Sequence, residues 1–222
     1  MGKLIVFEGT DGSGKSTQFE LLAKRLEAEQ IGFQRLRFPQ YEGPSSALIR
    51  MYLGGAFGDD PEAVNAYAAS TFYAVDRYAS YQRVWKDYYQ GGGFVVSDRY
   101  TTSNAVHQGS KVPEAERAEF FRWLYDLEYD RMGLPRPDLV VLLDMPVELS
   151  EQLMRKREQS TGTHADIHER DEDYLKKCRD VALHAAKYYG WRTVSCAKDG
   201  AIRGVEDIHE EVYAIVKSCL ED

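Results

Sequence analysis

A glycine-rich stretch near the N-terminus has the residue types and the spacing that hold a chain of phosphate groups. It fits the pattern G-x-x-x-x-G-K-[ST] and reads Gly9-Thr10-Asp11-Gly12-Ser13-Gly14-Lys15-Ser16, followed by Thr17. Glycines let successive backbone N–H groups curl around a phosphate, the lysine reaches the outer phosphates, and the hydroxyl binds Mg²⁺. The stretch therefore predicts a binding site for a nucleoside triphosphate and Mg²⁺.

The segments on either side of this stretch are those that such a loop requires. A short apolar run before it predicts a buried strand over residues 3–8. After it, Phe19, Leu22 and Leu26 recur at helical spacing and predict a helix that ends near Gln30, before Gly32. This order of strand, loop and helix places a phosphate at a helix N-terminus, where backbone N–H groups attract anions.

Charged residues follow another predicted strand, over residues 94–97. Asp98 and Arg99 come directly after it. A carboxylate at the carboxyl end of a strand near a phosphate loop can hold Mg²⁺ through water, and a neighbouring arginine can clamp phosphate oxygens. A surface ion pair is the weaker alternative, because both charges come directly after a buried strand. Ser16 and Asp98 are therefore the predicted metal-site residues.

Two further segments predict the wall of a site for a phosphoryl acceptor. Residues 38–41 leave the carboxyl end of a strand predicted over residues 33–38, where ligands bind in open α/β sheets, although an ordinary turn is an equal alternative. Tyr73 and Arg77 are spaced i, i+4 on a helix predicted over residues 61–90, so a ring and a guanidinium face the same side. An aromatic stripe farther along this helix favours core or a subunit interface and consists of Tyr78, Tyr81, Trp85 and Tyr88.

The whole chain predicts one α/β domain. Its 222 residues suffice for one buried core. Strand-like runs alternate with helical segments, which predicts a five-stranded parallel sheet flanked by helices, with the last strands over residues 138–144 and 191–196. With 28 Lys and Arg against 36 Asp and Glu, the net charge of −8 argues against a general nucleic-acid or anionic-membrane binder.

Cysteine usage and hydropathy predict the compartment. Cys178, Cys196 and Cys219 are odd in number and contain no C-x-x-C pair, so neither a disulfide framework nor a zinc site is indicated. No apolar run approaches the roughly 18 to 20 residues needed to span a bilayer. We expect a soluble, cytoplasmic protein without a targeting segment.

Together these motifs resemble the thymidylate kinase family, which phosphorylates thymidine monophosphate (dTMP). The resemblance covers nearly the whole chain and rests on residues 7–17, Phe38-Pro39, Phe72-Tyr73-Ala74-Val75-Asp76-Arg77, Asp98-Arg99-Tyr100 and Ser103-Asn104. It implies a P-loop NTPase fold, transfer of the γ-phosphoryl group of ATP to dTMP with Mg²⁺ as cofactor, and a homodimer.

The resemblance also implies a role for each matching residue. Lys15 and the loop amides would hold the ATP phosphates, Ser16 the metal, and Asp11 would face the acceptor's 3′-hydroxyl and the metal region. Lys198, after the fifth strand, would lie near adenine. In the acceptor pocket, Pro39 would form part of the wall after a cis peptide bond, and Tyr73 would stack on thymine, with Phe72 as the neighbouring candidate.

The remaining acceptor residues follow from the same resemblance. Arg77 would hydrogen-bond a thymine carbonyl, Arg99 would contact the acceptor phosphate, and Asn104 would line the base or phosphate side. The family commonly has tyrosine or phenylalanine at the position of His107, close to the sugar 2′ position. This departure leaves the strictness for deoxyribose open, and a partly exposed helix histidine is the alternative.

A small lid is predicted over about residues 155–170. A helix from residue 147 delivers Arg155 and Arg157, and basic side chains that close over a transferred phosphoryl group stabilise its charge and exclude water. No arginine stands among residues 10–13, and family members of that kind place the catalytic arginine in the lid. A solvated, charged helix end is an equal alternative for each residue.

Two other functions stay open at this stage. One is another pyrimidine nucleoside or nucleotide kinase of the same fold, although the Tyr73 and Arg77 pairing disfavours it. The other is a non-kinase regulatory protein that senses or hydrolyses ATP, which would need neither an acceptor wall nor a lid.

Overall fold

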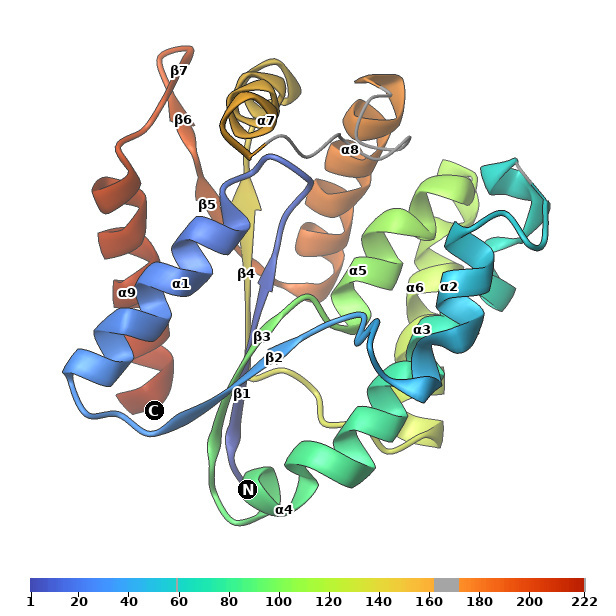
Figure 1. The fold of residues 1–222 in the computed structure, drawn as a ribbon, viewed down its shortest axis with the longest axis horizontal. Helices are drawn as coiled ribbons and strands as arrows, with labels where there is room; N and C mark the ends of the chain where they lie inside the picture. The colour runs from blue at the N-terminus through green and yellow to red at the C-terminus, as the bar shows by residue number, and fades with distance from the viewer. Residues whose placement is uncertain (59, 162–171, 222) are drawn as a thin grey trace. The chain divides into compact units, whose positions relative to one another are not determined.

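The computed structural model describes residues 1–58, 60–161 and 172–221 (Figure 1). Most of the predicted lid, residues 162–170, lies outside the described residues. The chain divides into two compact units. The first unit comprises Met1–Leu4 and Phe33–Pro137, and the second comprises Ile5–Gly32 and Asp138–Asp222.

The described strands confirm the predicted α/β class. They form a five-stranded sheet in the order β2-β3-β1-β4-β5 and a separate pair, β6-β7. In the first unit, β2 (Phe33–Arg37) runs parallel to β3 (Phe94–Asp98), with Phe33 opposite Phe94 and Arg37 opposite Asp98. All five residues of β3 are buried, the apolar Phe94, Val95 and Val96 as well as the polar Ser97 and Asp98. The Phe38–Pro39 peptide that follows β2 is cis.

Helices of the first unit carry most of the predicted acceptor residues. The α-helices are α2 (Ala47–Leu53), α3 (Ala66–Ser80), α4 (Lys86–Gln90), α5 (Thr101–His107) and α6 (Arg117–Tyr125). Two π-helical segments are η3 (Tyr81–Trp85) and η6 (Asp126–Arg131), and short 3₁₀ segments are η1 (Pro44–Ser46), η2 (Pro61–Ala63), η4 (Gly109–Lys111) and η5 (Glu114–Glu116). α3 packs against α2 and α5, and α5 packs against α6.

The long helix predicted over residues 61–90 is interrupted. α3 begins after Asn65, whose side chain accepts a hydrogen bond from the N–H of Ala68 and caps the helix. The π-helical segment η3 then divides the aromatic stripe, since the extra residue in such a turn rotates the side chains that follow. Tyr81 and Trp85 are buried, whereas Tyr78 and Tyr88 are each 40% exposed.

The second unit contains residues 5–8 of β1 (Lys3–Glu8) together with β4 (Leu139–Asp144) and β5 (Arg192–Ser195), and these strands pair in parallel. Their helices are α1 (Lys15–Ala28), α7 (Val147–Thr161), α8 (Glu172–Tyr189) and α9 (Val205–Glu221). α1 lies beside α9, and α8 and α9 pack on β4 (Figure 1). Lys198, which follows the fifth strand as predicted, lies in a short hairpin of β6 (Ala197–Lys198) and β7 (Ala201–Ile202).

Two features bear on the expectations from hydropathy and cysteine usage, namely the character of the described helices and the state of the cysteines. None of the described helices combines the length and apolar character that a membrane crossing requires. The three cysteines form no disulfide, and Cys178 and Cys196 are buried.

Candidate active site

The phosphate loop, residues 9–16, joins β1 to α1 in the second unit. β1 ends at the buried Glu8, whose Oε1 accepts a hydrogen bond of 3.0 Å from the N–H of Gly9. Gly14 caps α1 with a left-handed backbone, φ 81°. A Cβ on Gly9 would lie 2.5 Å from the Ser13 hydroxyl, so no larger residue fits there without movement. The loop therefore has the tight turn and the helix start that the sequence pattern predicts.

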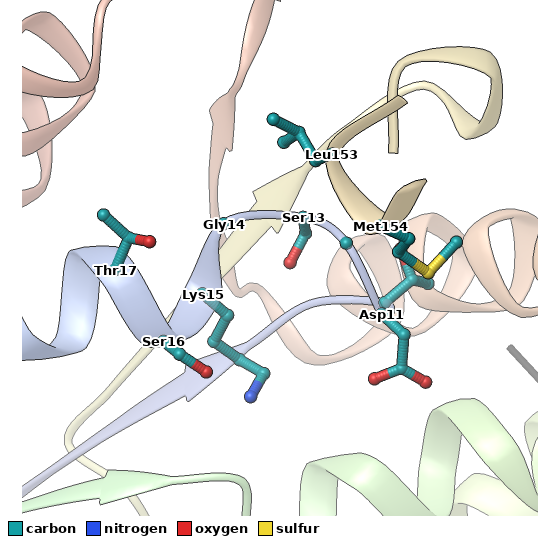
Figure 2. Close-up of a pocket in the computed structure, with 10 residues that line it drawn as sticks. Asp11, Ser13, Gly14, Lys15, Ser16, Thr17, Leu153 and Met154 are labelled. Atoms are coloured by element: carbon teal, nitrogen blue, oxygen red, sulfur yellow. The ribbon is translucent and has the colours of Figure 1, made fainter. Parts of the chain in front are cut away.

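This loop encloses a cavity of about 290 Å³ (Figure 2). Residues 10–17 line it from one side, and Leu153 and Met154 of α7 line it from the other. The Oγ atom of Ser13 is buried and has no hydrogen-bond partner among the described residues. A buried hydroxyl without a partner is costly, so the cavity fits a ligand that supplies polar atoms, as a phosphate does.

The polar side chains of the loop face a common region. Figure 2 shows the Lys15 ammonium, the Ser16 hydroxyl and the Asp11 carboxylate extending to the same side of the loop. Lys15 is mostly buried, whereas Ser16 and Thr17 are exposed. A cation and a hydroxyl at a helix N-terminus provide the two kinds of group that phosphates and their metal ion require.

Three other residues were predicted to act near ATP, and the structure describes the side chains of two of them, Arg155 and Lys198. Arg155 extends from α7, directly after Met154, and its exposed guanidinium lies 3.5 Å from Glu151. The side chain of Arg157 lies outside the described part of the structure. Lys198 is exposed on β6 and is not among the residues that line the cavity.

The loop after β2 is held to α3 by a buried carboxylate. Asp76 accepts hydrogen bonds from the N–H of Gln40 at 2.8 Å and from the Ser45 hydroxyl at 2.6 Å. Pro39 is half-buried within this held segment. The Asp76 carboxylate thus fixes this segment beside α3.

The two aromatic candidates on α3 have different surroundings. Phe72 packs against Phe57 and Tyr52, with ring centroids 5.8 and 6.3 Å apart. Tyr73 is half-buried and has no ring contact with another described residue. Burial raises the pKa of Tyr73 above its ordinary value, so the ring keeps its hydroxyl proton at neutral pH. Among the described residues, no aromatic side chain covers a face of the Tyr73 ring, whereas two pack against Phe72.

Arg77 forms a buried ion pair with Glu128. Its Nε and Nη2 atoms each donate a hydrogen bond of 2.6 Å to the carboxylate, and Nη1 donates to the carbonyl oxygen of Tyr100 at 3.3 Å. The two side chains are 2% and 0% exposed. Burial lowers the pKa of Arg77, but the charge and hydrogen bonds of Glu128 raise it above its ordinary value, so the guanidinium stays charged.

Asn104 joins the same buried cluster. Its Nδ2 atom donates to the carbonyl oxygen of Ser70 at 3.1 Å and to Glu128 Oε1 at 3.3 Å. Thr101, one helical turn earlier on α5, donates to Glu128 Oε2 at 2.7 Å. The structure thus brings together Arg77 and Asn104, two residues that the sequence placed in the acceptor pocket.

The residues after β3 form a second polar group. Asp98 is buried and accepts a hydrogen bond of 3.0 Å from Arg37. Arg99 has a left-handed backbone, φ 68°, which is uncommon for a residue with a side chain. Its Nη1 atom lies 2.8 Å from Nε2 of His107 and 3.4 Å from the Ser103 hydroxyl. His107 is half-buried, so it is neither a core residue nor a freely exposed one.

Sequence reasoning missed Glu128, because it identified neither α6 nor η6. A signal was present. Phe120, Leu124 and Glu128 are spaced i, i+4, i+8, which puts a carboxylate on the apolar face of a helical segment. A charge at such a position needs a partner, since charged residues are almost never fully buried alone. In the second unit, Asp144 at the end of β4 was likewise assigned no role, and its carboxylate is held by Arg179 at 2.7 and 3.1 Å.

Several known proteins are similar to this chain over most of its length. The family described as thymidylate kinase matches residues 7–212. A thymidylate kinase from Mycobacterium tuberculosis (strain H37Rv) is 32% identical over 199 residues, which cover 88% of this chain and 92% of the relative. A probable thymidylate kinase from Thermococcus onnurineus is 32% identical over 215 residues, 96% of each chain. Among solved structures, thymidylate kinase from Candida albicans has the same fold, with a TM-score of 0.71 at 22% identity over 98% of this chain and 92% of that one.

Proposed function

The chain belongs to the thymidylate kinase family, and we propose how its residues carry out that family's reaction, the transfer of the γ-phosphoryl group of ATP to dTMP. The observation that carries the proposal is the phosphate-loop cavity of about 290 Å³, with its buried Ser13 hydroxyl that lacks a partner. Lys15 and the loop N–H groups hold the β- and γ-phosphates of ATP there.

Mg²⁺ enters with ATP as part of the substrate. Among the described residues, no cluster of three or more His, Cys, Asp or Glu side chains could hold a metal ion without it. The Ser16 hydroxyl would hold the ion, Asp98 would act on it through water, and the ion would supply positive charge that offsets the charge of the phosphates. Lys15 and the loop orient the phosphates.

Acceptor recognition uses the residues of the first unit. Tyr73 offers a ring on which thymine stacks, and Arg77 offers N–H donors for a thymine carbonyl, with Asn104 beside it. Arg99 binds the acceptor phosphate, since a guanidinium matches phosphate oxygens in pairs. Pro39 and the segment held by Asp76 form the wall.

Transfer itself needs positioning and charge rather than a strong base. The acceptor phosphate is already anionic, so the enzyme aligns it with the γ-phosphate, neutralises repulsion and excludes water. Lys15, Arg99 and the arginines of α7, Arg155 and Arg157, supply positive charge, and Asp11 faces the acceptor sugar and the metal region. The lid predicted over residues 155–170, most of which lies outside the described residues, would cover the bound nucleotide.

We further propose that residues 1–222 act as one kinase domain, that the protein works in the cytoplasm, and that it forms a homodimer. Exposed apolar side chains of α3 and the segments after it, namely Val75, Tyr78, Val84 and Tyr88, support a dimer surface. A Tyr78→Glu variant that remains dimeric at micromolar concentration in sedimentation velocity contradicts this surface.

The direct test measures ADP formation from Mg-ATP with each nucleoside and nucleoside monophosphate offered separately. A clear preference for dTMP supports the proposal. Comparable rates on ribonucleotides show that the pocket has no sugar filter, and preference for a nucleoside or another pyrimidine nucleotide supports the related kinases. ADP formation that does not depend on an acceptor supports the ATP-dependent regulatory protein instead.

A further inference from the structure

Glu128 is the centre of a hydrogen-bond network that joins three segments of the first unit. It lies on η6 and is 0% exposed. Its Oε1 accepts from Arg77 Nη2 and Asn104 Nδ2, and its Oε2 accepts from Arg77 Nε and Thr101 Oγ1. An ionised carboxylate has about four lone-pair sites, so this network fills the carboxylate with donors from α3 and α5.

The same bonds set the direction of the Arg77 guanidinium. Arginine carries five N–H donors in a planar fork. Nε and one N–H of Nη2 bond to Glu128, and one N–H of Nη1 bonds to the Tyr100 carbonyl. One N–H on each terminal nitrogen is therefore left without a partner among the described residues. Two N–H groups at adjacent terminal nitrogens suit a ligand carbonyl oxygen.

We propose that Glu128 is the positioning residue of the acceptor-base site. It does not contact the substrate. By holding the Arg77 guanidinium side-on, it presents the two remaining N–H groups of Arg77 to a carbonyl oxygen of the base at low entropic cost, whereas both amide N–H groups of Asn104 are already bonded to Ser70 and Glu128. This inference rests on the proposed function, because it assigns how dTMP is selected rather than whether it is phosphorylated.

A purely structural ion pair is the competing explanation. Buried pairs often contribute little net stability, whereas removal of one partner is strongly destabilising. Kinetic measurements distinguish a positioning role of Glu128 from a purely structural one. A positioning role changes the KM for dTMP and leaves the KM for Mg-ATP unchanged, because the phosphate loop does not depend on Glu128. A purely structural role lowers the fraction of active enzyme and changes the KM for dTMP and the KM for Mg-ATP together.

The experiment compares Glu128→Gln with wild type. Glutamine keeps the shape but removes the charge and one acceptor. We expect the KM for dTMP to rise about ten- to a hundredfold, as for loss of a hydrogen bond to a charged group. The KM for Mg-ATP stays within about twofold and kcat within about threefold, limits set by the scatter expected of neutral changes. Glu119→Gln, the same change at an exposed position of α6, is the matched control and leaves every constant within that scatter.

Glu128→Asp is the second variant, because it keeps the buried charge but withdraws the carboxylate by one methylene. It must also raise the KM for dTMP selectively. The inference is overturned if either folded variant keeps the wild-type KM for dTMP. It is also overturned if the KM for dTMP and the KM for Mg-ATP rise equally. It is also overturned if neither variant folds, since the ion pair then serves the fold alone. A wild-type protein that does not phosphorylate dTMP contradicts the proposed function itself, and the two failures are thereby distinguished.

Discussion

Arg99 Nη1 lies 2.8 Å from Nε2 of His107, two helical turns along α5. A guanidinium nitrogen can only donate a hydrogen bond, so His107 Nε2 is the acceptor in this contact. Arg99 is the residue proposed to bind the acceptor phosphate. The histidine thus holds the arginine that is proposed to bind the acceptor phosphate.

Replacement of His107 by phenylalanine should therefore weaken the use of dTMP. The ring volume is kept, but Arg99 loses an acceptor, and we expect kcat/KM for dTMP to fall about three- to tenfold, near the lower end for hydrogen bonds to charged groups. Ser103→Ala is the control, because its contact with Arg99 is long, 3.4 Å. Equal kcat/KM values for His107→Phe and wild type would show that Arg99 needs no support from this residue.

Lys15→Met should abolish turnover without unfolding the protein. Its charge is proposed to stabilise the transferring phosphoryl group, and loss of one such stabiliser lowers rates by about a hundredfold or more. ADP formation gives the rate, and thermal melting by circular dichroism checks the fold. Lys24→Met, at an exposed position of the same helix, should behave as wild type. A folded and active Lys15→Met variant would refute the assignment of the phosphate loop.

Two glycines of the phosphate loop should respond differently to alanine. Gly12 and Gly14 both have left-handed backbones, with φ of 75° and 81°. At Gly14 a Cβ meets nothing within 4 Å, so only the backbone cost of about 1–2 kcal/mol applies. At Gly12 it would lie 2.7 Å from the carbonyl oxygen of Ser150 on α7.

Gly12→Ala should therefore lower the melting temperature further and raise the KM for Mg-ATP more than Gly14→Ala, because α7 must move. Calorimetry and initial rates measure the two effects. The prediction fails if the alanine at position 14 proves as damaging as the one at position 12.

Arg77→Ala should destabilise the protein by about 3–5 kcal/mol, since it leaves the Glu128 carboxylate buried without its partner. Chemical denaturation measures this free energy of unfolding. Arg131→Ala removes an exposed pair with Asp126, in which the side chains are 74% and 45% exposed, and should cost less than about 1 kcal/mol. Similar costs for the two variants would mean that Glu128 is solvated or protonated in solution. In the folded fraction, Arg77→Ala should also impair the use of dTMP more than ATP binding.

Cys196 should not react with thiol reagents at neutral pH. Burial raises the pKa of its thiol to about 12, from an ordinary value of 9.0. At pH 8 the thiolate, which is the reactive form, is then about one part in ten thousand. A disulfide reagent followed by peptide mass spectrometry should label the half-buried Cys219 first. Rapid labelling of Cys196 in the folded protein contradicts the prediction.

The same pKa shift predicts the pH dependence of stability. Because the folded-state pKa is raised, the contribution of this thiol is fully present below pH 9.0 and is lost as pH rises toward about 12. Cys196→Ala should flatten the fall in the free energy of unfolding over this interval and leave its slope below pH 8 unchanged. An identical slope in the two proteins above pH 9.0 would show that the folded-state thiol titrates normally.

The sequence by itself determined the phosphate loop and the cavity that it lines. Residues 9–16 are contiguous, so the turn, the cavity lining and the start of α1 follow from local backbone geometry and glycine placement. The strand predicted over residues 3–8 is β1 with the same bounds. Most other helices and strands were also predicted, because hydrophobic periodicity is local, but α6 and η6 were missed. The boundaries of α3 and the hairpin of β6 and β7 were not predicted, since a cap, a π-helical turn and a short edge pairing leave little periodic signal.

Only the tertiary structure decided how the acceptor residues are held. Tyr73 and Arg77 were recognised by spacing along one helix, but Glu128 lies 51 residues from Arg77 along the chain. The sequence offered both Phe72 and Tyr73 as the stacking ring. In the structure Phe57 and Tyr52 pack against Phe72, and neither packs against Tyr73. Spacing along a chain reports which side chains share a face of one element. Which donors meet a buried carboxylate depends on how separate elements pack, and that packing brought the partners of Glu128 together.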